Sequence, residues 1–138
     1  MNPPLIFDTS VWVDHINRKS TPQTNLLRYY LKHKFETPLV PVILQEFLQG
    51  VREDNQHKKI TEILRWHTRL ELPHMTAAIG ASSLFRGLRK KGVTIRKSND
   101  CLIAYYAIQF DLELVHNDKD FDLISANSPL KTWKNNNG

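Results

Sequence analysis

The stretch Gly92–Ile124, GVTIRKSNDCLIAYYAIQFDLELVHNDKDFDLI, decides the fold of this chain. Its polar loop ends at Asp100, and the apolar run that follows predicts a helix over residues 101–110. The segment 113–115 predicts a short strand, and the acid-rich turn after it contains Asp118. The stretch therefore places one carboxylate directly before a buried helix and another directly after a strand.

Two further acids stand in comparable places earlier in the chain. Leu5-Ile6-Phe7 is a fully apolar run, typical of a strand inside a parallel sheet, and Asp8 follows it directly. Glu46 lies on the polar side of a predicted amphipathic helix. In parallel sheets, ligands gather beyond the carboxyl ends of the strands, which is where both strand-end acids lie. We therefore expect one pocket to contain Asp8, Glu46, Asp100 and Asp118.

The remaining periodicities predict helices that alternate with short strands. Further helices are expected after Asp8 as far as Ile16 and over residues 23–33, 42–50, 54–67, 76–91 and 120–126. Further strands are expected over residues 37–40, 70–72 and 130–133. No internal repeat or linker appears, so we expect residues 1–138 to form a single domain. The alternation predicts an α/β fold, a three-layer α/β/α sandwich around a small parallel sheet.

Composition favours a globular protein of a reducing compartment. The chain has 138 residues, of which 41% are hydrophobic and 24% charged, and no apolar run approaches the ~20 residues of a membrane helix. The start Met1-Asn2-Pro3-Pro4 does not resemble a signal sequence, so we expect a cytoplasmic protein without membrane contact. The single cysteine excludes an internal disulfide, and its apolar neighbours predict a buried structural thiol. The expected core includes Cys101, Tyr105, Tyr106 and Phe110.

The net charge of +5 becomes more informative when the four acids of the candidate site are left out of the count. Without its four acids, the chain has 19 basic against 10 acidic residues. A basic body around an acidic pocket suits a polyanionic substrate, although a high pI also serves solubility alone. Four cations are candidates for phosphate contacts, with a solvated loop or a dipole-stabilised helix end as the alternative. They are Arg96, Lys97, Arg86 and Arg89.

Carboxylates gathered in one pocket point to a metal ion. Close negative charges repel each other and raise each other's pKa, and a hard divalent cation removes this conflict. Magnesium prefers oxygen ligands and keeps several waters, and manganese is its near substitute. Such an ion lowers the pKa of a bound water and neutralises a leaving oxygen, which is the chemistry of phosphodiester hydrolysis.

Four segments carry a family resemblance. They are Ile6–Trp12 (IFDTSVW), Val42–Glu46 (VILQE), Arg96–Ala104 (RKSNDCLIA) and His116–Phe121 (HNDKDF). In this order and spacing they resemble a PIN-domain ribonuclease, and the short chain is similar to the VapC-type toxins of bacterial toxin–antitoxin modules. The resemblance covers the chain from Leu5 to about Ile124.

The resemblance implies a role for each acid. Asp8, Asp100 and Asp118 would be metal ligands, and Glu46 would position or deprotonate the attacking water. Ser10 matches a hydroxyl that supports the first aspartate, and Asp120 matches a secondary ligand. One departure is His116, which stands where the family often has a threonine.

The resemblance also implies a function and partners. The protein would be a Mg²⁺-dependent endoribonuclease toxin, with Mn²⁺ as a possible substitute, that cleaves tRNA or rRNA to leave 5′-phosphate and 3′-hydroxyl ends. A VapB-like antitoxin would cover the site, and a homodimer would be the basic unit.

Other readings stay open from the sequence alone. Asp8 and Asp100 suit helix caps, and Glu46 suits an exposed helix face. A housekeeping PIN-type RNA-processing nuclease would share the chemistry, and a non-catalytic RNA-binding or partner-binding module would share the fold. A phosphotransfer domain centred on Asp8 is disfavoured, because position 10 is serine and positions 6 and 7 are apolar.

Overall fold

The computed structural model describes residues 2–135 and consists mainly of helices around a very small sheet. The helices of this part of the chain are α1 (Thr9–Ile16), α2 (Pro22–Lys32), α3 (Pro41–Gln49), α4 (Asp54–Leu64), α5 (His74–Lys90), α6 (Ser98–Phe110) and α7 (Lys119–Ala126). The strands are β1 (Leu5–Phe7) and β2 (Glu113–Val115).

The two strands pair in parallel, and their register fixes where the acids lie. Phe7 pairs with Val115, and the Asp8 N–H donates to the Val115 carbonyl at 2.9 Å. Both strands therefore end at the same edge of the sheet, and the residues that follow them emerge side by side. The prediction that Asp8 and the loop before Asp118 share one edge is confirmed.

Two of the three further expected strands are reduced to isolated bridges, and the third, over residues 70–72, contains none. Leu39 bridges to Arg69, and Thr132 bridges to Leu114, each in parallel orientation. None of the segments 37–40, 70–72 and 130–133 forms a ladder, and the prediction of regular strands there was wrong. Pro38 and Pro41 explain the first case, because proline has no N–H to donate to a ladder.

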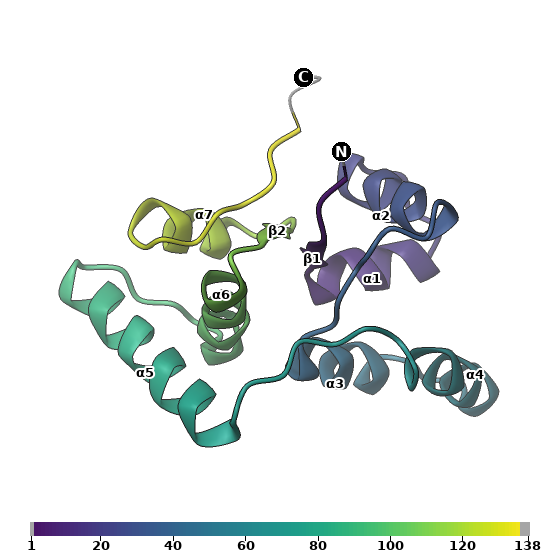
Figure 1. Cartoon of the computed structure of the whole chain (residues 1–138), viewed down its shortest axis with the longest axis horizontal. Helices are drawn as coiled ribbons and strands as arrows, with labels where there is room; N and C mark the ends of the chain where they lie inside the picture. The colour runs from purple at the N-terminus through teal and green to yellow at the C-terminus, as the bar shows by residue number, and fades with distance from the viewer. Residues whose placement is uncertain (1, 136–138) are drawn as a thin grey trace.

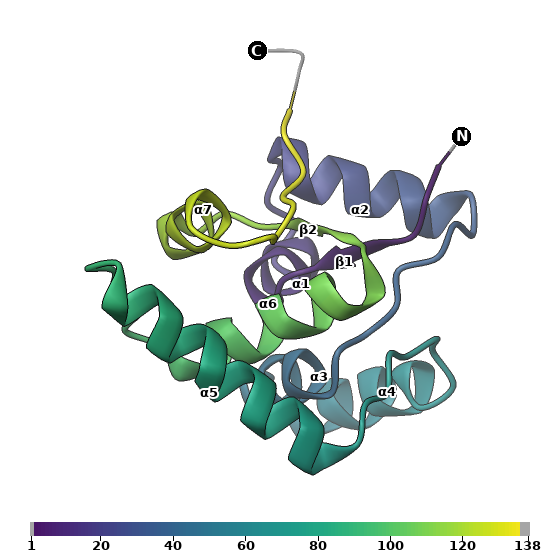
Figure 2. The same cartoon turned by 60° about the vertical axis from the view of Figure 1, so that its left-hand side comes forward.

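Helices cover both faces of the strands (Figures 1 and 2). α1 and α2 lie on one side, α6 and α7 lie on the other, and α5 packs outside α6. The expected three-layer α/β arrangement is confirmed. Gly80 lets α5 approach α6 closely, because a Cβ at this position would fall on the Tyr105 ring.

The core lies between these layers. Ile6, Val11, Leu114 and Phe121 are almost fully buried, and the Trp12 indole donates to the Phe7 carbonyl at 3.1 Å. Cys101 and Tyr106 are buried as expected, and Tyr105 is half-buried. Phe110 was wrongly expected in the core: it ends α6 and its exposed fraction is 38%.

The start of α6 also differs from the prediction. The helix begins at Ser98 with Lys97 in the N-cap position, three residues earlier than expected. Asp100 therefore lies within the first helical turn rather than before the helix, and the interpretation of Asp100 as a helix cap was wrong. An acid in the first turn is stabilised by the helix dipole, so this placement suits a buried carboxylate.

Candidate metal centre

Three carboxylates meet where α6 and α7 begin. Asp100, Asp118 and Asp120 each offer an oxygen atom, and these three atoms lie within 4.8 Å of one another. Asp100 comes from the first turn of α6, Asp118 is the N-cap residue of α7, and Asp120 follows in its first turn. Asp100 and Asp120 are buried, which is rare for acids without a partner.

Asp8 faces this triad from the end of β1. It is buried, and its Oδ2 accepts a hydrogen bond from the Ser10 hydroxyl at 3.0 Å. Its charge is close enough to raise the pKa of Asp100. The expected support of the first aspartate by Ser10 is thus present in the geometry.

Glu46 reaches the same region from α3. Its Oε1 accepts a hydrogen bond from the Thr9 hydroxyl at 2.7 Å, and its Oε2 accepts one from the Asn99 amide at 3.4 Å. The charge of Glu46 raises the pKa of Asp8. Glu46 therefore lies near Asp8, and Asp8 lies near Asp100, which forms the close triad with Asp118 and Asp120.

The electrostatics of this acid cluster (Asp8, Glu46, Asp100, Asp118 and Asp120) are unfavourable in the absence of a cation. Burial, and after it the charges of Asp8 and Asp118, raise the pKa of Asp100 to about 7. Burial also raises the pKa of Asp8, and the Ser10 hydrogen bond opposes this shift. A cluster that holds a proton near neutral pH is one in which a bound cation would be strongly favoured.

Unpaired oxygen atoms show that the cluster fits a divalent metal. Asp100 Oδ2 and Asp120 Oδ2 are buried, and neither has a hydrogen-bond partner among residues 2–135. A buried carboxylate oxygen without a partner is costly, and a hard cation that prefers oxygen ligands removes this cost. The donor set consists of oxygen atoms alone, which suits a hard divalent cation rather than a soft metal.

The loop that carries Asp118 is fixed by its own hydrogen bonds. Asp118 Oδ1 accepts from the Asp120 N–H at 2.9 Å, and the Asp118 N–H donates to His116 Nδ1 at 3.0 Å. Burial lowers the pKa of the His116 imidazole, and the nearby Asp122 opposes this shift. The histidine is thus a buried loop residue, and its bond to Asp118 was not predicted from the sequence.

The candidate phosphate-binding cations are arranged unevenly. Lys97 is exposed and its Nζ lies 3.8 Å from Asp118 Oδ2, at the mouth of the acid cluster. Arg96 is exposed in the same loop, and Arg86 lines a hollow that also contains Asn99. The Arg89 guanidinium instead lies over the Phe85 ring, 5.8 Å from its centroid. Lys97 is therefore the cation best placed beside the metal centre.

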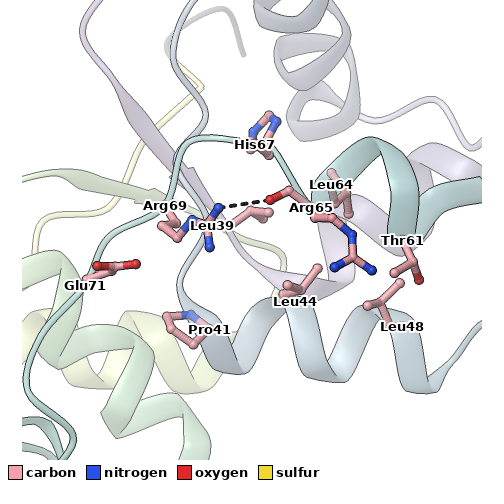
Figure 3. Close-up of a pocket in the computed structure, with 10 residues that line it drawn as sticks. All are labelled: Leu39, Pro41, Leu44, Leu48, Thr61, Leu64, Arg65, His67, Arg69 and Glu71. Atoms are coloured by element: carbon pink, nitrogen blue, oxygen red, sulfur yellow. Dashed lines mark hydrogen bonds between the residues drawn. The ribbon is translucent and has the colours of Figure 1, made fainter.

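A hollow of about 390 Å³ lies elsewhere, between α3, α4 and residues 65–71 (Figure 3). Leu39, Leu44, Leu48 and Leu64 line it, and Arg69 donates to the Arg65 carbonyl at 2.9 Å in its wall. It shares no residue with the acid cluster, and its lining is mostly aliphatic. It therefore offers no set of metal ligands.

Cys101 follows the cluster residue Asp100 but takes no part in its chemistry. Burial, and after it the charge of Asp100, raise the pKa of the Cys101 thiol to about 11. A thiol with this pKa is a poor nucleophile and a poor metal ligand at neutral pH. The prediction of a structural thiol agrees with this environment.

Comparisons with known proteins give the same class for this arrangement. The family model of the PIN domain matches residues 5–127, which include every acid of the cluster. The chain belongs to the PIN-domain family. Within it, the chain is 30% identical over 128 residues to ribonuclease VapC11 of Mycobacterium tuberculosis and to VapC ribonuclease Mb1587 of Mycobacterium bovis. Each alignment covers 92% of this chain and 96% of the relative.

Solved structures agree with this placement. VapBC2 of Rickettsia felis, bound to a DNA fragment from its promoter, contains a chain with a TM-score of 0.71 and 25% identity; the match covers 95% of this chain and 99% of the other. VapBC-1 of Haemophilus influenzae gives a TM-score of 0.68 at 17% identity, covering 94% of this chain and 96% of the other. The second likeness is one of fold.

Proposed function

We propose that this protein is a Mg²⁺-dependent endoribonuclease that acts as the toxin of a VapBC-like toxin–antitoxin module. The observation that carries the proposal is the buried acid cluster, in which Asp100 has a pKa of about 7 and two buried oxygen atoms have no hydrogen-bond partner within residues 2–135. The ribonuclease names of the relatives, matched over 92% of this chain, support the choice of RNA as substrate.

In the proposed site, Asp100, Asp118 and Asp120 hold the metal, and Asp8 is a further ligand, direct or through water. When bound, Mg²⁺ supplies a Lewis acid that polarises the scissile phosphate and lowers the pKa of an attacking water. Mn²⁺ is a possible substitute, because the all-oxygen donor set suits both ions.

The protein residues around the metal have separate tasks in this proposal. Glu46, oriented by Thr9 and Asn99, accepts a proton from the attacking water. Lys97 contacts a phosphate of the RNA beside the cluster, and Arg96 and Arg86 extend this contact along the strand. Ser10 holds the Asp8 carboxylate in place. Water attacks phosphorus in line, which leaves 5′-phosphate and 3′-hydroxyl ends on a tRNA or rRNA.

We further propose that the protein binds a VapB-like antitoxin, forms a homodimer and works in the cytoplasm. The structural neighbours from R. felis and H. influenzae are VapBC assemblies, which supports an antitoxin partner. Met75 and Ile79 lie one turn apart on α5 with 74% and 62% of their surface exposed, which supports a protein contact there. No helix within residues 2–135 is both long and apolar enough to cross a bilayer.

The deciding experiment measures RNA cleavage by the purified protein with Mg²⁺ and with excess EDTA. We expect 5′-phosphate products with Mg²⁺, and loss of cleavage by about 10²-fold or more with EDTA or after Asp100→Asn. Glu62→Gln, on the exposed face of α4, is the matched control and should cleave like the unaltered protein. Full cleavage by Asp100→Asn, or in EDTA, would refute the catalytic assignment.

A second experiment separates a toxin from a housekeeping nuclease, since both would cleave RNA. Expression of the protein should arrest growth, and coexpression of a small neighbouring gene should relieve the arrest. Cleavage without any growth defect would favour RNA processing as the role.

A further inference from the structure

The His116 ring lies between two acids of the loop and helix that follow it, and its Nδ1 makes a hydrogen bond. Its Nδ1 accepts the Asp118 N–H at 3.0 Å, so Nδ1 has no proton and the neutral ring carries its proton on Nε2. Nε2 lies 3.5 Å from Asp122 Oδ1 on the opposite side of the ring. The imidazole therefore lies between the backbone of one acid and the side chain of another.

We infer that His116 is a positioning residue for Asp118, and that the Asp122–Lys134 pair holds its ring in place from the surface. The inference rests on the proposed function, because it assigns His116 a task toward the metal that Asp118 would bind. It concerns a position where this chain departs from the threonine frequent in the family.

Asp118 is held in one conformation by hydrogen bonds of its backbone and side chain. As N-cap residue of α7 it has an extended backbone (φ −121°, ψ 128°), and its Oδ1 is already occupied by the Asp120 N–H. Fixing the Asp118 N–H as well removes rotation of the peptide that leads into the cluster. The remaining oxygen, Oδ2, lies 3.8 Å from Lys97 Nζ.

The His116 ring is itself held in place by its neighbours. His116 is buried and its ring lies against Phe121, with centroids 5.2 Å apart. Beyond it, Lys134 Nζ donates to Asp122 Oδ1 at 3.4 Å. Lys134 belongs to a segment fixed on β2, because Leu114 bonds to the backbone of both Lys131 and Trp133. The end of the described chain thus supports the acid cluster through one histidine.

Oriented partners of this kind matter for metal sites. A group that holds a ligand in its binding conformation typically changes metal affinity or activity by about 10- to 100-fold when it is lost. A purely space-filling histidine would have no such effect if its replacement folds equally well.

The test compares two amides at position 116. In His116→Asn the amide oxygen takes the place of Nδ1 and can accept the Asp118 N–H, whereas in His116→Gln the amide group lies at the distance of Nε2. Mn²⁺ affinity of the purified protein, measured by electron paramagnetic resonance, should fall about tenfold or more for Gln and stay within about threefold for Asn. Thermal unfolding of both variants checks that they fold alike.

Two further measurements do not depend on RNA cleavage. In the metal-free protein, ¹⁵N chemical shifts of the His116 ring should show a bare Nδ1 and a protonated Nε2. On the exposed side, Asp122→Ala and Asp122→Asn remove the same charge, but only Asn keeps an acceptor for Nε2. We expect Asp122→Ala to bind Mn²⁺ about threefold more weakly than Asp122→Asn.

The outcomes separate the inference from the proposed function. Equal Mn²⁺ affinity of the Asn and Gln variants and the unaltered protein, or a proton on Nδ1, would overturn the inference and leave the metal site intact. Failure of the unaltered protein to bind Mn²⁺ would overturn the metal site itself, and the inference with it.

Discussion

The Thr9 hydroxyl donates a hydrogen bond of 2.7 Å to Glu46 Oε1, across 37 positions of the chain. This bond ties the first residue of α1 to the middle of α3 and fixes the direction of the Glu46 carboxylate. Thr9 itself follows Asp8, so one dipeptide serves both the metal side and the water side of the proposed site. The contact distinguishes Glu46 from an ordinary exposed acid of an amphipathic helix.

Loss of the Thr9 hydroxyl should slow RNA cleavage without weakening RNA binding. Thr9→Val keeps the shape of the side chain but leaves Glu46 free to rotate, so we expect kcat to fall about tenfold while KM changes little. Thr9→Ser keeps the hydroxyl and should retain most of the activity. Single-turnover cleavage of a labelled RNA measures both constants, and equal kcat values for Val and Ser would contradict this role.

The metal-free protein should become less stable as the pH rises toward neutrality. The pKa of Asp100 is raised from its ordinary value of 3.8 to about 7, so between about pH 4 and pH 7 the folded protein keeps a proton that the unfolded chain has released. Raising the pH through this window therefore favours unfolding. Thermal midpoints in EDTA across the window measure the effect.

Asp100→Asn provides the matching variant for this pH dependence. It removes both the titrating group and one negative charge, so its midpoint in EDTA should be higher and should vary less with pH. Added Mg²⁺ should stabilise the unaltered protein more at pH 8 than at pH 5, because protons compete with the cation. An Asp100→Asn variant with an unchanged pH profile would place the titration elsewhere.

Sequence reasoning located the acids because their positions follow from local rules. A parallel pair of strands places its two carboxyl ends at one edge, and this is enough to bring Asp8 near Asp118. The family resemblance ranked Asp118 as a metal ligand and Asp120 as a secondary one, but no local rule indicated that Asp120 is the buried one of the two. Because α7 begins at Lys119, Asp120 lies in the first helical turn and is directed inward.

The hydrogen-bond partners of the acids could not be predicted from the sequence, for a different reason. Thr9 and Asn99 contact Glu46 across 37 and 53 positions, and no local pattern announces such a pair. The prediction of short strands failed because a segment of three or four residues is too short for its pattern to distinguish a strand in a ladder from a single bridge. For His116 the sequence offered one indication, which was its departure from the threonine that the resemblance implies at this position. That departure lies in the loop that leads to Asp118.

Lys97 should contribute one phosphate contact to RNA binding. Its Nζ lies 3.8 Å from Asp118 Oδ2, so a phosphate at the metal would come within its reach. In Lys97→Ala, the slope of log affinity against log salt should decrease by about 0.7 for single-stranded RNA. Lys59→Ala, on the exposed face of α4, is the control and should leave the slope unchanged. Binding is measured in the Asp100→Asn background, where cleavage does not interfere.

The exposed apolar face of α5 should mediate self-association. Met75 and Ile79 are separated by one helical turn and are largely exposed in a single chain. Burying their apolar surface against a second copy of the chain would favour association. A charge at this position would be desolvated in an interface, so Ile79→Asp should shift the protein from dimer to monomer in light scattering. Leu123→Asp places the same charge on an exposed leucine of α7 and should leave the dimer intact. Dissociation by Leu123→Asp but not by Ile79→Asp would move the interface from α5 to α7.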